Sequence, residues 1–256
     1  MSARSCSWLH AVLGVWAFGV AGAAAAQDDW HWPEKGKNYQ VFPKDFPAQK
    51  LSAVMRGFTR ALGVRCTYCH VGQESQPLSA YDFASDENPN KARAREMYRM
   101  LGDINDHLKK LEPSGDKRVN MWCNTCHQGR PRPTTLEEEL GEAYRKGGLP
   151  AALTRYRDLR DRFYGKAGYN FGESSLSAFG QELLALKDTE GALAVWRLNT
   201  AQFPQSGTAW SSLADGYLAA GKTTLAEISF RKALELDPDN PAALEKLQKL
   251  AEKPAH

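Results

Sequence analysis

The sequence predicts an all-α protein built of two consecutive parts. In the first half, residues 47–63 and about 91–111 repeat apolar residues at the three- and four-residue spacing of an amphipathic helix. In the second half, residues 173–240 repeat a pattern of apolar and small residues with a period of 34. A Pro-rich stretch at 131–135 lies between the two halves. We therefore expect two helical domains joined by a short linker.

Length and composition exclude several classes of protein. A chain of 256 residues suffices for one large domain or two modest ones. Hydrophobic residues make up 42% and charged residues 25%, which is typical of a soluble protein and excludes a multi-span membrane protein or a mostly disordered chain. The net charge is only +3 and Gly-rich phosphate loops do not occur. Nucleic-acid or nucleotide binding is therefore not expected.

Residues 1–26 have the order of a secretory signal peptide. Arg4 precedes an apolar run at 8–20, which is followed by small residues up to Ala26. The apolar run is short for a transmembrane helix, although a retained anchor is the alternative. Cleavage after Ala26 would leave a mature chain in the periplasm of a bacterium-like cell, without a transmembrane span and with four cysteines.

These four cysteines form two Cys-x-x-Cys-His motifs, the attachment signature of a c-type haem. The motif residues are Cys66, Cys69, His70, Cys123, Cys126 and His127. Two thiols at this spacing add to the two vinyl groups of a haem, and the adjacent histidine ligates the iron. A four-thiolate zinc site explains neither histidine, and a redox dithiol does not explain the duplication. The sequence therefore predicts two haem c groups, with His70 and His127 as proximal ligands.

Each iron needs a sixth ligand if it is to carry electrons without binding small molecules. Met55 lies on the apolar face of the helix expected at 47–63, where Pro47 suits the start and Gly63 the end. Periodicity alone leaves Met55 either as the ligand of the first iron or as a core residue.

The helix expected at about 91–111 offers Met97 on its apolar stripe and Met100 at the edge of that stripe. Both are candidates for the second iron. His107 on the same helix and His31 near the mature start are weaker candidates, because a lone histidine is more often a surface or hydrogen-bonded residue.

Several motifs in order resemble the cytochrome c subunit family of photosynthetic reaction centres, over about residues 38–132. They are Phe42-Pro43-Lys44-Asp45, Met55 eleven residues before Cys66, Asp82-Phe83-Ala84-Ser85-Asp86, Met97-Tyr98-Arg99-Met100 and Cys126-His127-Gln128-Gly129. The resemblance implies that each haem lies along a helix that supplies its ligand, mostly methionine. It implies Met55 for the first haem and, for the second, Met97 with Met100 as the alternative. The family carries four haems in two pairs, so this chain is similar to one such pair.

The second half resembles tetratricopeptide (TPR) repeats, whose unit is two antiparallel helices in 34 residues. The matching positions are Leu176, Phe179, Gly180, Leu183, Ala192, Trp196 and Pro204, then Trp210, Leu213, Ala214, Tyr217, Ala226, Phe230, Ala233 and Pro238. Asn199 departs from the pattern. Residues 136–163 are expected to form a degenerate earlier helix pair, and 241–252 a solvating last helix. Such repeats form a concave groove that commonly binds a partner's peptide or helix, although here they could merely stabilise the first half.

Together these features predict an all-α fold: a small dihaem cytochrome c domain at 27–130, a linker at 131–135 and a TPR-like α-solenoid at 136–256. The expected function is electron transfer without catalysis, with the solenoid docking a redox donor or acceptor, including a membrane-associated electron-transfer complex. The alternatives are a haem enzyme that reduces peroxide or a nitrogen oxide, and a haem-based sensor. Either one requires an iron without a sixth ligand.

Overall fold

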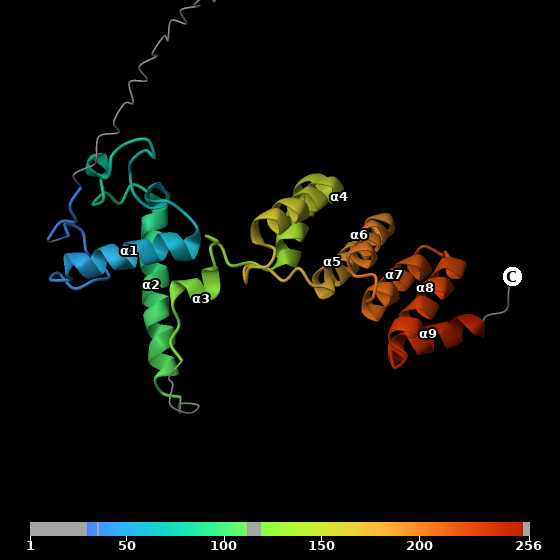
Figure 1. Cartoon of the computed structure of the whole chain (residues 1–256). Coiled ribbons are helices and arrows are strands. Elements are labelled where there is room, and N and C mark those ends of the chain that lie inside the picture. Colours follow the sequence, from blue (N-terminus) through green and yellow to red (C-terminus); the bar gives the residue numbers. More distant parts are fainter. Residues whose placement is uncertain (1–29, 35, 112–118, 253–256) are drawn as a thin grey trace, which may run out of the picture.

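The computed structural model describes residues 30–34, 36–111 and 119–252, so the expected signal peptide at 1–26 lies outside the described residues. Within the described ranges the regular secondary structure is helical, apart from an isolated β-bridge between Val71 and Asp82. Figure 1 shows two groups of helices in one elongated row, with the C-terminus at the far end of the second group. The expected all-α fold is confirmed.

The first group consists of three helices and two short 3-10 turns. The helices are α1 (Ala48–Leu62), α2 (Pro89–Leu108) and α3 (Cys123–His127), and the turns are Cys66–Tyr68 and Leu78–Ala80. Helices α1 and α2 cross in Figure 1, and the rings of Phe58 on α1 and Tyr98 on α2 lie 6.1 Å apart. Helix α2 begins at Pro89 with the Asn88 side chain as its N-cap, and ends three residues before the expected Leu111.

Helix α1 ends at a point of close approach to the second haem motif. Gly63 adopts a left-handed conformation, with φ of 66°, and caps the helix as the sequence predicts. A Cβ atom on Gly63 would lie 2.2 Å from the backbone oxygen of Gly129. The Gly129 amide in turn donates to the Ala61 carbonyl over 2.8 Å. Glycine at position 63 is therefore required both by conformation and by space.

The second group begins with the expected degenerate helix pair. Helix α4 (Leu136–Phe163) is two helices that meet at a kink, where Gly147 and Gly148 have non-helical backbone angles. Gly148 has φ of 66°, a conformation that glycine adopts at little cost. Thr135 and Glu138 form a capping box at the start of α4, next to the linker.

The helix boundaries follow the 34-residue period of the sequence without deviation. Helices α5 (Glu173–Ala185) and α6 (Thr189–Gln202) form one pair, and α7 (Gly207–Ala219) and α8 (Thr223–Leu236) form the next. Each boundary of the second pair lies 34 residues after its counterpart in the first. Helix α9 (Pro241–Ala251) packs on α8 as the last helix. The predicted solenoid of helix pairs is confirmed.

Trp196 is the centre of packing between the two repeats. Its side chain is fully buried, and Cβ atoms on Gly180 of α5 or Gly216 of α7 would lie 2.4 Å and 2.6 Å from its ring. The departure from the repeat pattern at Asn199 has a polar cause. The Asn199 amide donates to the Glu173 carbonyl and to the Ser177 hydroxyl, at 2.9 and 3.0 Å. Asn199 therefore joins α6 to the start of α5.

Apolar burial is distributed unequally between the halves. Both large clusters of buried apolar side chains belong to residues 136 onward. Among the described residues before 136, the buried apolar side chains are Leu51 and Ala61, both on α1. The described part of the first half therefore lacks an apolar core of the kind that stabilises the second half.

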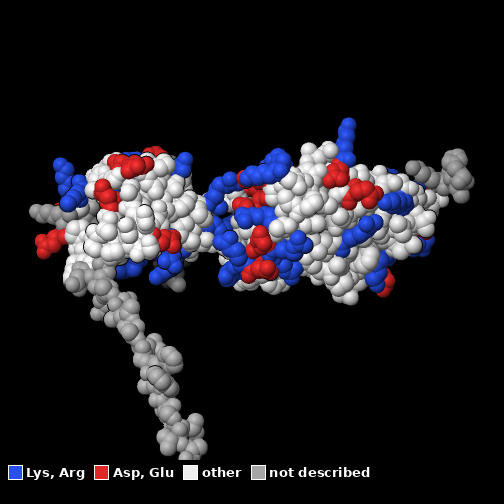
Figure 2. Space-filling view, turned by 90° about the horizontal axis from the view of Figure 1, so that it is seen from above, with Lys and Arg blue, Asp and Glu red and all other residues white. Residues whose placement is uncertain are grey.

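Charge is also distributed unequally. In Figure 2 the first half presents a largely uncharged face, whereas Lys and Arg gather over α4 beside the junction of the two halves. Arg132, Lys146, Arg155 and Arg162 are among the basic residues there, interleaved with acidic ones. None of the helices that the structure describes is long and apolar enough to cross a membrane.

The packing around Trp196 predicts that Gly180→Ala destabilises the protein by about 1–3 kcal/mol, because the added methyl group overlaps a ring that cannot move within a filled core. Denaturant unfolding of the full chain measures the effect. Gly141→Ala on α4 is the matched control, because its Cβ would meet only the mobile ends of the Glu182 and Arg145 side chains. Equal effects of the two substitutions would contradict this account of the packing.

Candidate haem-binding site

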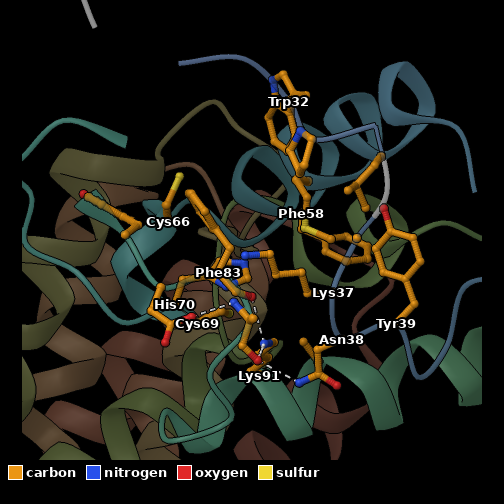
Figure 3. A pocket seen from close by; sticks show the side chains of 18 of the residues that line it. Trp32, Lys37, Asn38, Tyr39, Phe58, Cys66, Cys69, His70, Phe83 and Lys91 are labelled. Carbon is orange, nitrogen blue, oxygen red and sulfur yellow. Dashed lines mark hydrogen bonds between the residues drawn. The ribbon is translucent and has the colours of Figure 1, made fainter. Parts of the chain in front are cut away.

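A cavity of about 470 Å³ in the first half is lined by the first haem motif and by its candidate sixth ligand. Met55 reaches it from α1, and Cys66, Cys69 and His70 from the turn that follows. In Figure 3 the two cysteines and the histidine lie on one side of the cavity, while Tyr39 lies on the other. The structure therefore brings the first motif and its candidate sixth ligand to one cavity.

The start of α2 holds the first motif in place. The Asn88 side chain donates to the Thr67 carbonyl over 3.3 Å, and the Asn90 side chain donates to the Tyr68 carbonyl over 3.0 Å. These two carbonyls belong to the residues between Cys66 and Cys69. The position of both thiols is thus fixed from outside the motif as well as by the turn itself.

His70 lies in an apolar environment. Its ring meets Phe83 edge-on at 5.0 Å. Burial, together with the charge of nearby Lys91, lowers the pKa of His70 to about 4. The imidazole is therefore neutral at pH 7, which is the form that ligates iron.

An ionic network closes the side of the cavity near α2. Lys91 donates to the carbonyls of Phe83, Ala84 and Ser85, and both Lys91 and Arg95 pair with Asp86 at 3.2 and 2.8 Å. The hydrogen bond from Arg95 is the main reason why the pKa of Asp86 falls well below its usual range. This network anchors the loop that carries Phe83 onto α2.

Two buried donors at the cavity fit a haem. Trp30 and Tyr39 line the cavity, and neither Trp30 Nε1 nor the Tyr39 hydroxyl has a hydrogen-bond partner within the described protein. A buried donor without a partner costs free energy, so such groups usually face a ligand or water. The carboxylates of a haem accept hydrogen bonds, and the mainly apolar remainder of the lining suits its ring. The residues present therefore fit the group that the motif implies.

The second motif forms α3, and its histidine is held by the following residue. The Trp122 amide donates to the Thr125 hydroxyl over 3.0 Å at the start of the helix. At its end His127 is buried, with Nδ1 2.8 Å from the Arg130 carbonyl. A carbonyl can only accept, so Nδ1 carries the proton and Nε2 presents its lone pair. This is the arrangement that orients a metal-ligating histidine.

The candidate sixth ligands of the second motif are not gathered into a cavity with it. Met97 and Met100 are both exposed on α2. The Asn105 side chain attaches the segment before α3 to α2, because it accepts from the Met121 amide over 2.8 Å and donates to its carbonyl over 3.0 Å. Asn105 lies eight residues, or about 12 Å along the helix axis, beyond Met97.

Helix register separates the two methionines. Met97 lies in one row with Leu101, Ile104 and Leu108, which are all half-buried. Met100 lies at the edge of this row, because it stands four residues before half-buried Ile104 but is flanked by exposed Glu96 and Asp103. His107 is also exposed on α2, and His31 is exposed where it lines the first cavity.

Among the described residues the cysteines form no disulfide, and each pair stays within its own motif. Burial raises the pKa of Cys69 and of Cys123, so both are protonated at neutral pH. Among the described residues no three His, Cys, Asp or Glu side chains gather as a metal site would require. The geometry of these thiols thus offers no four-thiolate centre.

Sequence reasoning missed the residues that complete the first cavity from a distance. Trp30 and Tyr39 come from the segment before α1, and Lys91 and Arg95 from the buried face of α2. The cluster of aromatic residues at 30–42 was the available signal. Arg130, three residues after His127, was likewise not singled out.

Comparison with known proteins agrees with the geometry. Residues 47–135 match the family described as photosynthetic reaction centre cytochrome C subunit. The photosynthetic reaction center cytochrome c subunit of Rubrivivax gelatinosus is 35% identical over 97 residues, which cover 34% of this chain and 24% of that protein. Cytochrome c-554 of Chloroflexus aurantiacus is 34% identical over 94 residues, which cover 37% of this chain and 20% of that protein. The chain thus spans a quarter or less of these relatives.

Solved structures similar to parts of this chain include TPR domains. The first TPR of Spaghetti (RPAP3), bound to an HSP90 peptide, is 22% identical and covers 46% of this chain and 88% of that one, with a TM-score of 0.33. The structure of MamA from Desulfovibrio magneticus is 17% identical, and the match covers 63% of this chain and 80% of that one, also with a TM-score of 0.33.

The first half is therefore similar, over residues 47–135, to a family of c-type cytochromes, which are electron-transfer proteins that bind haem covalently. The resemblance to the reaction centre cytochrome c subunit is confirmed for residues 47–135, which include both motifs. The remainder of the chain is a solenoid of TPR-like helix pairs.

The two hydrogen bonds of Asn105 predict that Asn105→Ala destabilises the protein by about 1–3 kcal/mol, because the Met121 amide and carbonyl lose their partner. Thermal unfolding of the haem-loaded protein measures the effect. Asn120→Ala is the control, since Asn120 is exposed in the same segment. A stability loss no larger than that of the control would show that Asn105 does not hold the second motif on α2.

Proposed function

We propose that the protein is an exported electron carrier with two covalently bound haem c groups, whose TPR-like half docks it to a redox partner. The observation that carries the proposal is the cavity in which Met55 lies with Cys66, Cys69 and His70. Each haem supplies an iron that accepts and releases one electron. The electron-transfer family of the first half supports this chemistry over catalysis.

The first haem would be held by residues of the cavity. Cys66 and Cys69 would attach it, and His70 and Met55 would ligate its iron. Trp30 Nε1 and the Tyr39 hydroxyl would donate to its carboxylates, since both are buried without a partner. The mainly apolar lining excludes water, and the ionic network of Lys91, Arg95 and Asp86 keeps the surrounding loop fixed.

The second haem would be attached by Cys123 and Cys126 and ligated by His127 through Nε2. Met97 is the better sixth ligand because it lies in the row of half-buried residues on α2, whereas Met100 lies at the edge of that row next to exposed Glu96 and Asp103. Full coordination keeps small molecules off the iron and limits rearrangement on oxidation. Methionine sulfur favours reduced iron and so raises the potential above that of a bis-histidine haem.

Export and docking complete the proposal. The order of charged, apolar and small residues in 1–26 supports export to the periplasm. The helix pairs from α4 to α8 form the kind of solenoid that binds a partner's peptide or helix. A redox donor or acceptor, free or within a membrane-associated complex, is the partner that an electron carrier requires.

Substitution of Met55 tests the ligand set of the first haem. Met55→Leu keeps the side-chain volume but removes the sulfur, so we expect about half of the Met-to-ferric charge-transfer band to be lost and the potential of one haem to fall. Visible spectroscopy and a redox titration of the loaded protein measure both changes.

Met100→Leu is the matched control, because it exchanges the same groups at an exposed position of α2. We expect it to leave the band and both potentials unchanged. An unchanged spectrum and unchanged potentials in Met55→Leu would show that Met55 is only a packing residue.

A further inference from the structure

Arg130 lies between the second haem motif and the TPR-like half. Its side chain is 92% buried, since only 8% is exposed, and it belongs to no ion pair in the part of the chain that the structure describes. Nε donates to the His127 carbonyl over 3.2 Å, and Nη1 donates to the Thr134 carbonyl over 2.5 Å. A buried guanidinium with this orientation fixes the backbone on both sides of it.

The guanidinium of Arg130 lies over a ring of the second half. Its central carbon lies 4.3 Å from the centre of the Tyr169 ring, a favourable cation–π contact. Tyr169 lies in the connection between α4 and α5. Phe163 and Phe171 meet its ring edge-on at 5.3 and 6.1 Å. The position of Tyr169 is therefore set by the packing of the helix pairs.

The other side of Arg130 is tied to the iron-ligating imidazole. The Arg130 amide donates to the His127 carbonyl over 2.9 Å, and His127 Nδ1 donates to the Arg130 carbonyl over 2.8 Å. A hydrogen bond from Nδ1 makes the imidazole more basic and orients its ring, which stabilises the oxidised iron. A displacement of Arg130 would therefore change the hydrogen bond between His127 Nδ1 and the Arg130 carbonyl.

We propose that Arg130 is a positioning residue for His127 and that Tyr169 holds it, so that the TPR-like half sets the potential of the second haem. The inference rests on the proposed ligation of an iron by His127. It assigns the solenoid a role in the redox site in addition to docking. Arg130 and Tyr169 also line a cleft of about 880 Å³ between the halves, with Gly129 and Arg162. A segment bound in this cleft would act on the same contact.

The test is a redox titration of the full-length loaded protein carrying Tyr169→Leu. Loss of the ring loosens Arg130 and weakens the hydrogen bond from Nδ1, so reduced iron becomes more favoured at the second haem. We expect the equilibrium constant for reduction of one haem to rise about two- to fivefold, as the strength of a cation–π contact permits, while that of the other stays constant. Ferric spectra of the axial imidazole should change for the same haem.

Two variants separate this role from a merely structural one. Tyr169→Phe keeps the ring face and should restore both potentials to those of the unsubstituted protein. Tyr164→Leu removes the ring beneath Arg160, a similar contact at 4.6 Å in the same connection but away from His127, and should move neither potential. Circular dichroism confirms that each variant is folded.

The inference is overturned if a folded Tyr169→Leu variant leaves both potentials unchanged, or if it shifts both equally. It is also overturned if Tyr169→Phe shifts the potential as much as Tyr169→Leu does. A protein that carries one haem before any substitution would instead refute the proposed function, and the inference with it. The titration of the unsubstituted protein distinguishes these two failures.

Discussion

The close approach of Gly63 and Gly129 is the contact on which the arrangement of the first half depends. It joins the end of α1 to the end of the second haem motif, and the hydrogen bond from Gly129 to Ala61 secures it. Gly63 stands three residues before Cys66, and Gly129 two residues after His127. One contact thus fixes both motifs relative to the helix that carries Met55. Only glycine at position 63 permits it, because φ is positive and a Cβ would overlap the opposite backbone.

The two halves are stabilised in different ways. The solenoid buries aromatic and aliphatic side chains around Trp196. The first half buries few apolar side chains and relies on polar contacts, notably those of Lys91 and Arg95 with Asp86. The proposed haem would supply an apolar interior to this half, so we expect its attachment and the folding of this half to be coupled. Arg130 lies at the junction of these two halves.

Much of the fold could be predicted from the sequence, because the signals are local. The glycine that ends α1, the Asn88-Pro89 start of α2 and the 34-residue period each reflect backbone or nearest-neighbour physics. Helical periodicity placed Met55 on the face that lines the first cavity. Contacts between distant segments left no such signal: Trp30 and Tyr39 reach the cavity from the N-terminal segment, and Tyr169 meets Arg130 from the second half. Such contacts depend on how elements pack, which periodicity does not encode.

The proposed function requires that both irons have a full set of ligands and that each transfers one electron. Exposure of the fully reduced, full-length protein to carbon monoxide, with a redox titration before it, tests this claim directly. The account predicts two low-spin haems per chain, two one-electron steps and an unchanged reduced spectrum in carbon monoxide. A high-spin fraction that binds carbon monoxide would contradict it, because an iron open to small molecules is the site of a haem enzyme or sensor.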